Sequence, residues 1–376
     1  MPKNIVVCCD GTANEFARDH TNVVKLYSTL VHDQLTQSTY YHPGIGTMEP
    51  PGALTPLRRR LTRVLGMALG AFLENDIRDA YVFLMKVYEP GDKIFFFGFS
   101  RGAYTVRAVA SLLRLYGLLR PGNETLVPYA IRMMMAVTKA REKDGEYKKE
   151  MDKYFGLAAQ FKATMSRECN IWFVGVWDTV SSVGWIENPL KLPYSADNPD
   201  IEIGRHAIAI DERRAFFRTN LWRRGSNPDE PHGPKNDLQV WFPGVHCDVG
   251  GGYPEAESGL SKLALEWMLG EAQQHDLKVD GRRVLEVLGR TPTQNVTYVK
   301  PDANATLHES LTGAWKLAEY VPKRHYNWKT RKYEHRMNQY RRRTIPPGSL
   351  IHWSAYERKD NYADRLPSNV TPLPKK

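Results

Sequence analysis

Gly98-Phe99-Ser100-Arg101-Gly102 is the segment of the chain with the clearest chemical potential. It directly follows an apolar, strand-like run and directly precedes a helical pattern. A serine in a Gly-x-Ser-x-Gly turn between strand and helix is held on a strained elbow with its hydroxyl presented for reaction. The glycines leave room where a side chain would collide with the turning backbone. We therefore predict Ser100 as a nucleophile; the alternative is that it only caps the helix.

A nucleophilic serine needs a histidine base oriented by a carboxylate, in the chain order Ser, Asp or Glu, His. Asp178 follows the apolar run from Asn170 to Trp177, and we predict it as the orienting acid; its alternative role is to cap the turn that follows. His246 lies in a glycine-rich loop after another strand-like run. We predict it as the base, and the histidines held in reserve are His308 and His352.

The oxyanion formed in acyl transfer needs two backbone donors. We predict the amide of Arg101 as one, and that of Gly11 or Thr12, in the turn after the first strand, as the other. Asp10 is expected to hold that turn by accepting hydrogen bonds. Asp10 and Asp248 could instead be metal ligands, but hard cations need more oxygen ligands than the sequence assembles here. We expect neither a metal nor a cofactor.

The elements that must position these residues alternate between strand and helix. Continuous apolar runs predict buried strands, and apolar residues at helical spacing predict the helices between them. The expected strands are Ile5 to Cys9, Ser38 to His42, Lys93 to Phe97, Asn170 to Trp177 and Leu238 to Phe242. The expected helices are Asn22 to Leu30, a broken helix within Leu57 to Val87, Ala103 to Leu119 and Leu260 to Gln274. This order predicts an α/β fold of the α/β-hydrolase type, with a mainly parallel sheet covered by helices on both faces.

We expect residues 1–376 to form a single catalytic domain. Residues 121–168 are rich in charge and methionine without a strand pattern, which predicts a helical cap insertion. The chain after about residue 300 is interpreted as an irregular, basic appendage, and its last stretch, from Pro367 to Lys376, as a loose tail.

The composition is that of a folded enzyme, with 42% apolar and 25% charged residues in 376. No run of about 18 uncharged apolar residues predicts a membrane span, and no signal peptide is evident. The four cysteines lack metal-site spacing and are interpreted as reduced thiols. We expect synthesis in the cytoplasm, with export by a route independent of a signal peptide, or peripheral membrane association, as the alternatives.

The formal net charge of +10 favours an anionic partner. Nine Lys or Arg residues lie between Lys323 and Arg343, among aromatic residues and a single acid, Glu334. No nucleic-acid motif accompanies this stretch, so a solvated or lipid-facing surface is favoured over a nucleic-acid patch. The basic and apolar segment from Leu57 to Leu65 is a second candidate for contact with an anionic membrane.

Four ordered motifs carry a family resemblance. They are Cys9-Asp10-Gly11-Thr12-Ala13-Asn14, Gly98 to Tyr104, Gly175-Val176-Trp177-Asp178-Thr179-Val180, and His246-Cys247-Asp248-Val249-Gly250-Gly251-Gly252-Tyr253. Together they resemble the catalytic domain of type VI secretion phospholipase effectors. The resemblance extends from residue 4 to about residue 270 and continues weakly through His308 and His352.

The resemblance implies an α/β-hydrolase fold and Ser-Asp-His esterase chemistry on membrane phospholipids, as in bacterial effectors. By position in the motifs, the triad would be Ser100, Asp178 and His246. Effector members commonly carry extra membrane-binding regions beyond the catalytic part, and we expect this chain to be little more than that part, so the resemblance does not by itself imply a toxin role. Two alternatives stay open: an esterase or thioesterase acting on a small soluble substrate, and a non-catalytic binding module on a hydrolase scaffold. The sequence does not set the oligomeric state.

Overall fold

A computed structural model describes the protein except for residues 1, 12–19, 45–72, 141–146, 181–191, 224–231, 295, 314, 328–331, 360 and 376. Among the predictions above, Thr12 and the segment from Leu57 to Leu65 lie outside the described residues. Within the long helical region predicted up to Val87, the structure describes a helix over residues 73–87.

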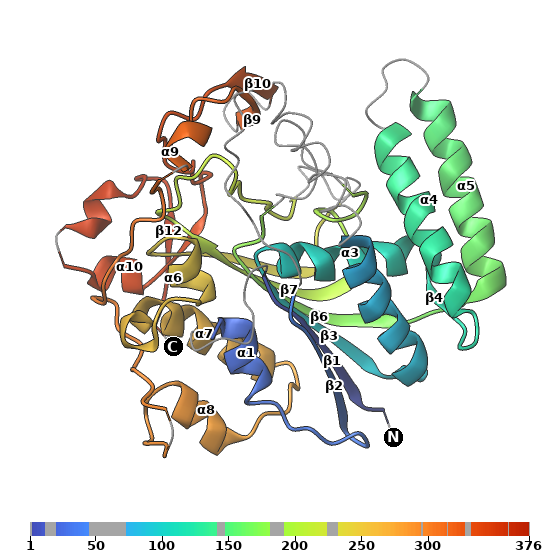
Figure 1. Cartoon of the computed structure of the whole chain (residues 1–376), viewed down its shortest axis with the longest axis horizontal. Helices are drawn as coiled ribbons and strands as arrows, with labels where there is room; N and C mark the ends of the chain where they lie inside the picture. The colour runs from blue at the N-terminus through green and yellow to red at the C-terminus, as the bar shows by residue number, and fades with distance from the viewer. Residues whose placement is uncertain are drawn as a thin grey trace.

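An eight-stranded sheet forms the centre of the molecule (Figure 1). Its strand order is β12-β11-β8-β7-β6-β3-β1-β2, and each neighbouring pair is parallel. The strands are β1 (Asn4–Cys9), β2 (Gln37–His42), β3 (Lys93–Phe99), β6 (Asn170–Trp177), β7 (Ile201–Ala209), β8 (Asn236–Phe242), β11 (Leu350–His352) and β12 (Thr371–Leu373). The two-stranded pairs are β4 (Leu118–Leu119) with β5 (Ser166–Arg167), and β9 (Lys323–Asn327) with β10 (Lys332–Arg336).

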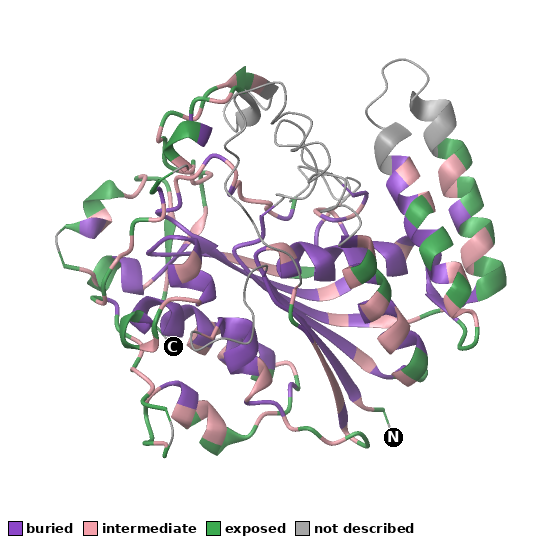
Figure 2. Cartoon of the chain, viewed as in Figure 1, coloured by how far each residue is buried: buried purple, intermediate pink, exposed green. Residues whose placement is uncertain are grey.

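Helices cover both faces of the sheet, because successive side chains of each buried strand point to opposite faces. In β1, Ile5, Val7 and Cys9 pack on one side, and Val6 and Cys8 pack on the other. The first side is covered by residues 73–87, α3 (Arg101–Tyr116), α4 (Val127–Ala140) and α5 (Tyr147–Met165). The second side is covered by α1 (Asn22–Tyr27), α6 (His246–Gly250), α7 (Gly259–Gln273) and α8 (Gly281–Val287). The buried strands lie between these layers (Figure 2).

The remaining short elements are 3-10 helices and single turns of α-helix. They are η1 (Glu124–Leu126), η2 (Glu255–Glu257), α9 (Trp315–Ala318), α10 (Ser354–Glu357) and η3 (Tyr362–Arg365). Of the helices that the structure describes, none combines the length and apolar character needed to cross a bilayer.

The predicted α/β fold, with a parallel sheet between helical layers, is confirmed. Each of the five expected strands is present within a few residues of its expected bounds. Residues 121–168 contain the helices α4 and α5, which pack against α3 as a projecting pair (Figure 1). Their role as a cap stays a prediction. The four cysteines are free thiols, as predicted.

The interpretation of the C-terminal region as an irregular appendage was wrong for its last part, residues 350–373. β11 pairs with β8, and β12, inside the stretch predicted as a loose tail, pairs with β11. Ile351 of β11 is buried against Trp241 and Ile208 of the neighbouring strands. The C-terminal region therefore completes one edge of the sheet.

The parallel strands bring distant parts of the chain together at the carboxyl end of the sheet. After β1 the chain adds β2 on one side and then β3 on the other, which makes the neighbourhood of β1 and β3 a point where the strand order reverses. Open parallel sheets place their functional loops at the carboxyl ends of the strands near such a point. The turns after β1, β3, β6 and β8 carry Gly11, Ser100, Asp178 and His246.

Candidate active site

Ser100 occupies a strained turn between β3 and α3. Its backbone angles are φ 57° and ψ −119°, a region that non-glycine residues rarely adopt. The Ser100 amide donates to the carbonyl of Trp177 at 3.1 Å, which fixes the turn to the end of β6. The Ser100 side chain makes no capping hydrogen bond to α3. Strain of this kind is retained where it serves a site, and this geometry favours the nucleophile elbow over the helix cap.

The glycines of the Ser100 turn are required by close backbone contacts. A Cβ on Gly98 would lie 2.6 Å from the Gly102 carbonyl oxygen, and a Cβ on Gly102 would lie 2.1 Å from the Cys9 carbonyl oxygen. Gly11 approaches Ser100 itself, since a Cβ there would lie 3.2 Å from Ser100 Cβ. The elbow is thus packed directly against the end of β1.

Asp178 is fully buried at the end of β6 and has φ 36°. Its Oδ1 accepts the Ala209 amide at 3.0 Å, and its own amide donates to the Ala207 carbonyl at 2.7 Å. The Arg343 guanidinium contacts both carboxylate oxygens. Burial alone would raise the pKa of Asp178, but the Arg343 charge and the His246 hydrogen bond outweigh it and hold the pKa well below its ordinary value. The carboxylate is therefore ionised.

His246 begins α6 and lies against Asp178. The distance from its Nδ1 to Asp178 Oδ2 is 2.5 Å. Because the carboxylate is ionised, Nδ1 is the donor, which leaves Nε2 of the neutral ring as a proton acceptor. Burial lowers the pKa of His246, and this outweighs the raising effect of the Asp178 hydrogen bond. A neutral imidazole oriented by a carboxylate is the arrangement that a general base needs.

Two aromatic rings hold the imidazole of His246. The Phe99 ring lies with its centroid 4.5 Å from the imidazole centroid, and the Phe217 ring packs edge-on at 4.8 Å. Phe99 directly precedes Ser100, so one side chain links the Ser100 turn to the His246 imidazole. A Cβ on Gly250 would lie 1.9 Å from a Phe99 ring atom, which explains a glycine at this position of α6. The structure gives no hydrogen bond between Ser100 and His246; catalytic hydrogen bonds are often long before substrate binds.

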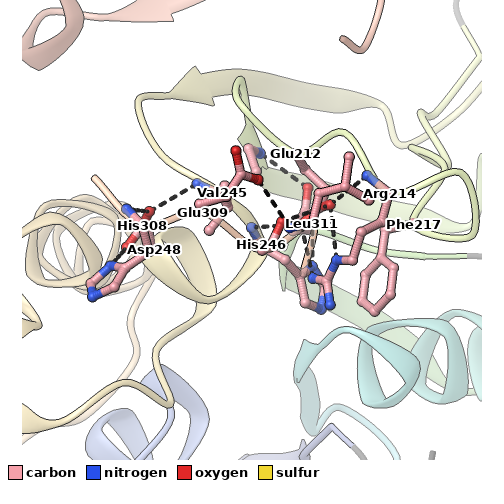
Figure 3. A network of polar contacts seen from close by, with 12 residues as sticks. Glu212, Arg214, Phe217, Val245, His246, Asp248, His308, Glu309 and Leu311 are labelled. Carbon is pink, nitrogen blue, oxygen red and sulfur yellow. Dashed lines mark hydrogen bonds and ion pairs between the residues drawn. The ribbon is translucent and has the colours of Figure 1, made fainter. Parts of the chain in front are cut away.

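The buried carboxylate of Glu212 holds the backbone of His246 in place (Figure 3). It accepts the His246 amide at 3.2 Å and forms a two-point pair with Arg214, at 3.0 and 2.9 Å. Burial would raise the pKa of Glu212, but Arg214 lowers it to about 2. Arg214 also lies over the Phe217 ring, 3.5 Å from its centroid. The Glu212–Arg214 pair thus fixes both the first residue of α6 and the position of the Phe217 ring.

The reserve histidines lie elsewhere. His308 donates from its backbone to Asp248 Oδ2, and its Nδ1 lies 2.6 Å from Asp248 Oδ1 (Figure 3). Asp248 Oδ2 also accepts the Val245 amide at 3.0 Å, so Asp248 joins His308 to the first turn of α6. His352 stacks on Phe242 with centroids 4.3 Å apart, and its Nδ1 contacts the Ser354 hydroxyl. The structure brings His246, and neither of these two, to Asp178.

The two amide sources expected for the oxyanion hole differ in their surroundings. Arg101 is the first residue of α3 and directly follows Ser100, and the role of its amide stays a prediction. The Gly11 amide instead donates to the Asp10 carboxylate at 2.7 Å. Asp10 also accepts the hydroxyls of Thr21 and Tyr41, at 2.6 and 3.0 Å, so it holds the turn as predicted. Asp10 and Asp248 are therefore both engaged in turns of the backbone.

Sequence reasoning missed Glu212 and Arg343. Glu212 follows β7, whose partly alternating sequence Ile201-Glu202-Ile203-Gly204-Arg205-His206-Ala207-Ile208-Ala209 could have indicated a strand and an acid near its carboxyl end. Arg343 carries no local signal, because it is one of nine basic residues between Lys323 and Arg343. The interpretation of that whole stretch as surface was wrong for Arg343, whose side chain is 8% exposed.

Comparison with known proteins identifies a family of similar chains. A family model described as "T6SS, Phospholipase effector Tle1-like, catalytic domain" matches residues 3–271. An uncharacterised protein of Saccharomyces cerevisiae, YEL023C, is 39% identical over 225 residues, which are 57% of this chain and 32% of that protein. The chain thus corresponds to about a third of the yeast protein, and a yeast relative does not support a bacterial origin.

Two solved structures show partial likeness. An uncharacterised protein from Pseudomonas aeruginosa is 20% identical, with a TM-score of 0.43 over 75% of this chain and 47% of that one. The Tle1 effector bound to the VgrG spike of the type VI secretion system is 18% identical, with a TM-score of 0.36 over 69% of this chain and 52% of that one.

Proposed function

Because the chain belongs to the family of type VI secretion Tle1-like phospholipase effector catalytic domains, we propose that it hydrolyses carboxylic ester bonds of lipids, phospholipids above all. The nucleophile in this proposal is Ser100, the base is His246 and the orienting acid is Asp178. The observation that carries it is the buried pair of His246 Nδ1 and Asp178 Oδ2, 2.5 Å apart, beside a serine on a strained strand-to-helix turn.

The reaction proceeds in two displacement steps. His246 Nε2 takes the proton of the Ser100 hydroxyl as Oγ attacks the ester carbonyl, and the Ser100 acyl ester forms when the alcohol leaves with that proton. Water then attacks the acyl ester with the help of the same base, which releases the fatty acid and restores Ser100. Asp178 stabilises the imidazolium in both steps. The Arg101 amide holds the oxyanion, together with the amide of Gly11 or Thr12.

A donation from Gly11 to the oxyanion would require a local rearrangement. Its amide would have to leave the Asp10 carboxylate, to which it donates at 2.7 Å. Preorganised donors cost no reorganisation at the moment of reaction, and an engaged amide lacks that advantage. This observation counts against Gly11 as the second donor.

We place the substrate at an anionic membrane surface. Leu317 of α9, Tyr320 and Met337 expose apolar side chains in the same C-terminal region of the chain as the exposed Arg341 and Arg342. Basic side chains near an anionic bilayer contribute about 1 kcal/mol each, and apolar side chains add by entering the interface. The segment from Leu57 to Leu65 is the second contact in this proposal. The enzyme would reach the membrane from the cytoplasm or after export.

A lipid-class panel tests this function. Wild type and Ser100→Ala are incubated with vesicles of single phospholipid classes and, separately, with short-chain soluble esters and thioesters. The proposal expects the wild type to release fatty acid from vesicles and the variant to release none above background. Turnover of soluble esters alone would assign the small-substrate alternative, and no turnover with any substrate would favour a binding module.

A further inference from the structure

The guanidinium of Arg343 donates to three groups at the candidate site, the Asp178 carboxylate and the carbonyls of Phe217 and Ala209. Nη1 and Nη2 contact Asp178 Oδ1 and Oδ2 at 2.5 and 3.0 Å. Nε and Nη2 donate to the Phe217 carbonyl at 3.1 and 2.5 Å, and Nη1 donates to the Ala209 carbonyl at 3.1 Å. A guanidinium has five N–H donors in a fixed plane, and here five hydrogen bonds use them. Such a two-point pair fixes the plane of a carboxylate as well as its charge.

A constrained turn at Gln339 and Tyr340 precedes Arg343 in the chain. Gln339 and Tyr340 both have positive φ, at 50° and 62°. The buried carboxylate of Glu319 accepts the Tyr340 amide at 3.0 Å and the Ala215 amide at 2.7 Å. Consecutive left-handed residues cost free energy and persist when their surroundings hold them. The turn leaves Arg341 and Arg342 exposed and directs Arg343 inward, so the placement is specific to one residue of the basic run.

Arg343 also holds Phe217, whose ring packs against the His246 imidazole. Phe217, whose carbonyl accepts from Arg343, packs its ring edge-on against the His246 imidazole at 4.8 Å. Asp178, the other partner of Arg343, accepts from His246 Nδ1. Arg343 therefore restrains both groups that orient the imidazole.

We propose that Arg343 is a positioning residue of the hydrolase. It fixes the Asp178 carboxylate against His246, and its positive charge makes the protonated form of His246 less stable. This inference rests on the proposed function. Without Arg343, the buried carboxylate would keep the imidazole of His246 and the backbone amide of Ala209 as hydrogen-bond partners. The positive charge keeps the carboxylate ionised while opposing a second positive charge on the imidazole a short distance away.

The effect on proton transfer depends on all the charges around the pair. The charged or titratable groups that face Asp178 and His246 are Arg343, Glu212, Arg214, His206, Cys247 and Asp248. Burial lowers the pKa of His206 to about 3, and its Nε2 accepts the Thr179 amide, so this neutral ring adds no charge. Glu212 and Arg214 form a pair with each other. Arg343 is thus the cation whose charge is directed at Asp178.

The test compares Arg343→Gln and Arg343→Lys with Arg282→Gln, a change at an exposed arginine of α8, as the matched control. Hydrolysis of a short-chain soluble ester is measured against pH, so that membrane binding does not enter. We expect Arg343→Gln to lose about 10²-fold in kcat with little change in KM, as for misplacement of a catalytic group. Its acidic limb of kcat/KM should move to higher pH, because removal of a positive charge favours the imidazolium. Arg343→Lys should keep the position of the limb and lose kcat, and Arg282→Gln should match the wild type.

A second measurement needs no substrate. Titration of the His246 imidazole by NMR should show protonation at higher pH in Arg343→Gln than in the wild type. The inference is overturned if Arg343→Gln keeps both the wild-type kcat and the wild-type limb, or if kcat falls while the limb and the NMR titration stay in place. Absence of any ester hydrolysis by the wild type would count against the proposed function, and the NMR titration would still decide the placement of Arg343. If Arg343→Gln fails to fold, Arg343→Lys decides the question, because lysine keeps the charge but lacks the planar guanidinium. A wild-type kcat in that variant would exclude positioning by the two-point pair with Asp178.

Discussion

The replacement Glu212→Gln tests whether the buried network behind His246 stabilises the fold. The carboxylate of Glu212 has no exposed surface, and it accepts the amide of His246, the amide of Arg214 and both of its guanidinium arms. The Ser310 hydroxyl donates to it as well, at 3.1 Å. Glutamine keeps the size of the side chain and one acceptor oxygen but removes the charge, which leaves the guanidinium of Arg214 without its ionic partner in this network.

The magnitude follows from the burial of the pair. Removal of one partner of a buried ion pair costs about 3–5 kcal/mol, because the other charge stays buried and uncompensated. The amide oxygen of glutamine still accepts a hydrogen bond, so we expect the lower end of that range, about 3 kcal/mol, in the free energy of unfolding. An exposed pair provides the control. Lys375 and Glu357 are joined at 2.9 Å with side chains 59% and 50% exposed, so Glu357→Gln should cost less than about 1 kcal/mol.

The assay is urea unfolding of wild type and both variants, followed by tryptophan fluorescence and by circular dichroism. The pH dependence adds a signature. Since the pKa of Glu212 falls from its ordinary 4.5 to about 2 on folding, its contribution is fully present above pH 4.5 and is lost as the pH falls toward 2. The difference between wild type and Glu212→Gln should shrink over that window. A loss below about 1 kcal/mol at pH 7, equal to the control, would refute the reasoning.

Three further predictions concern catalysis and location. His246→Ala should lose nearly as much activity as Ser100→Ala, and the double variant should be little worse than either, since members of a triad act as a unit; additive losses in kcat would contradict this. The acidic limb of kcat/KM should lie below the ordinary imidazole pKa of 6.5, because burial lowers the pKa of His246; a limb above 6.5 in a pH–rate profile would assign another base. Binding to vesicles should rise with anionic lipid content, weaken with salt and fall when Arg58, Arg59 and Arg60 become Gln; equal co-sedimentation with neutral and anionic vesicles would exclude electrostatic docking.

The parts of the fold that the sequence predicts are those where local pattern and tertiary placement agree. β1, β3 and β6 are buried on both faces, so they appear as continuous apolar runs. The turns after β3 and β6 place Ser100 and Asp178 at the same edge of the sheet, which a parallel topology requires. The glycine-rich loop around His246 could be recognised because α6 must pass within contact distance of Phe99.

The parts that were missed depend on long-range contacts. β7 contains Arg205 and His206, whose polarity interrupts the apolar pattern, yet both are buried because Glu271 pairs with Arg205 and the Thr179 amide donates to His206. β11 and β12 have three residues each, too few for a periodic signal, and they form because β8 offers an edge. Arg343 lies 165 residues from Asp178 along the chain, and nothing in the residues around it distinguishes it from Arg341 or Arg342.

Labelling of Ser100 by a fluorophosphonate probe tests the central proposal most directly, because only a serine activated by a neighbouring base reacts readily with the probe. The protein is incubated with the probe, and the modified residue is located by peptide mass spectrometry in wild type, Ser100→Ala and His246→Ala. We predict modification of Ser100 in the wild type, none in Ser100→Ala and strongly slowed labelling in His246→Ala. A wild-type Ser100 that stays unlabelled in folded protein, or equal labelling of the wild type and His246→Ala, would contradict the triad.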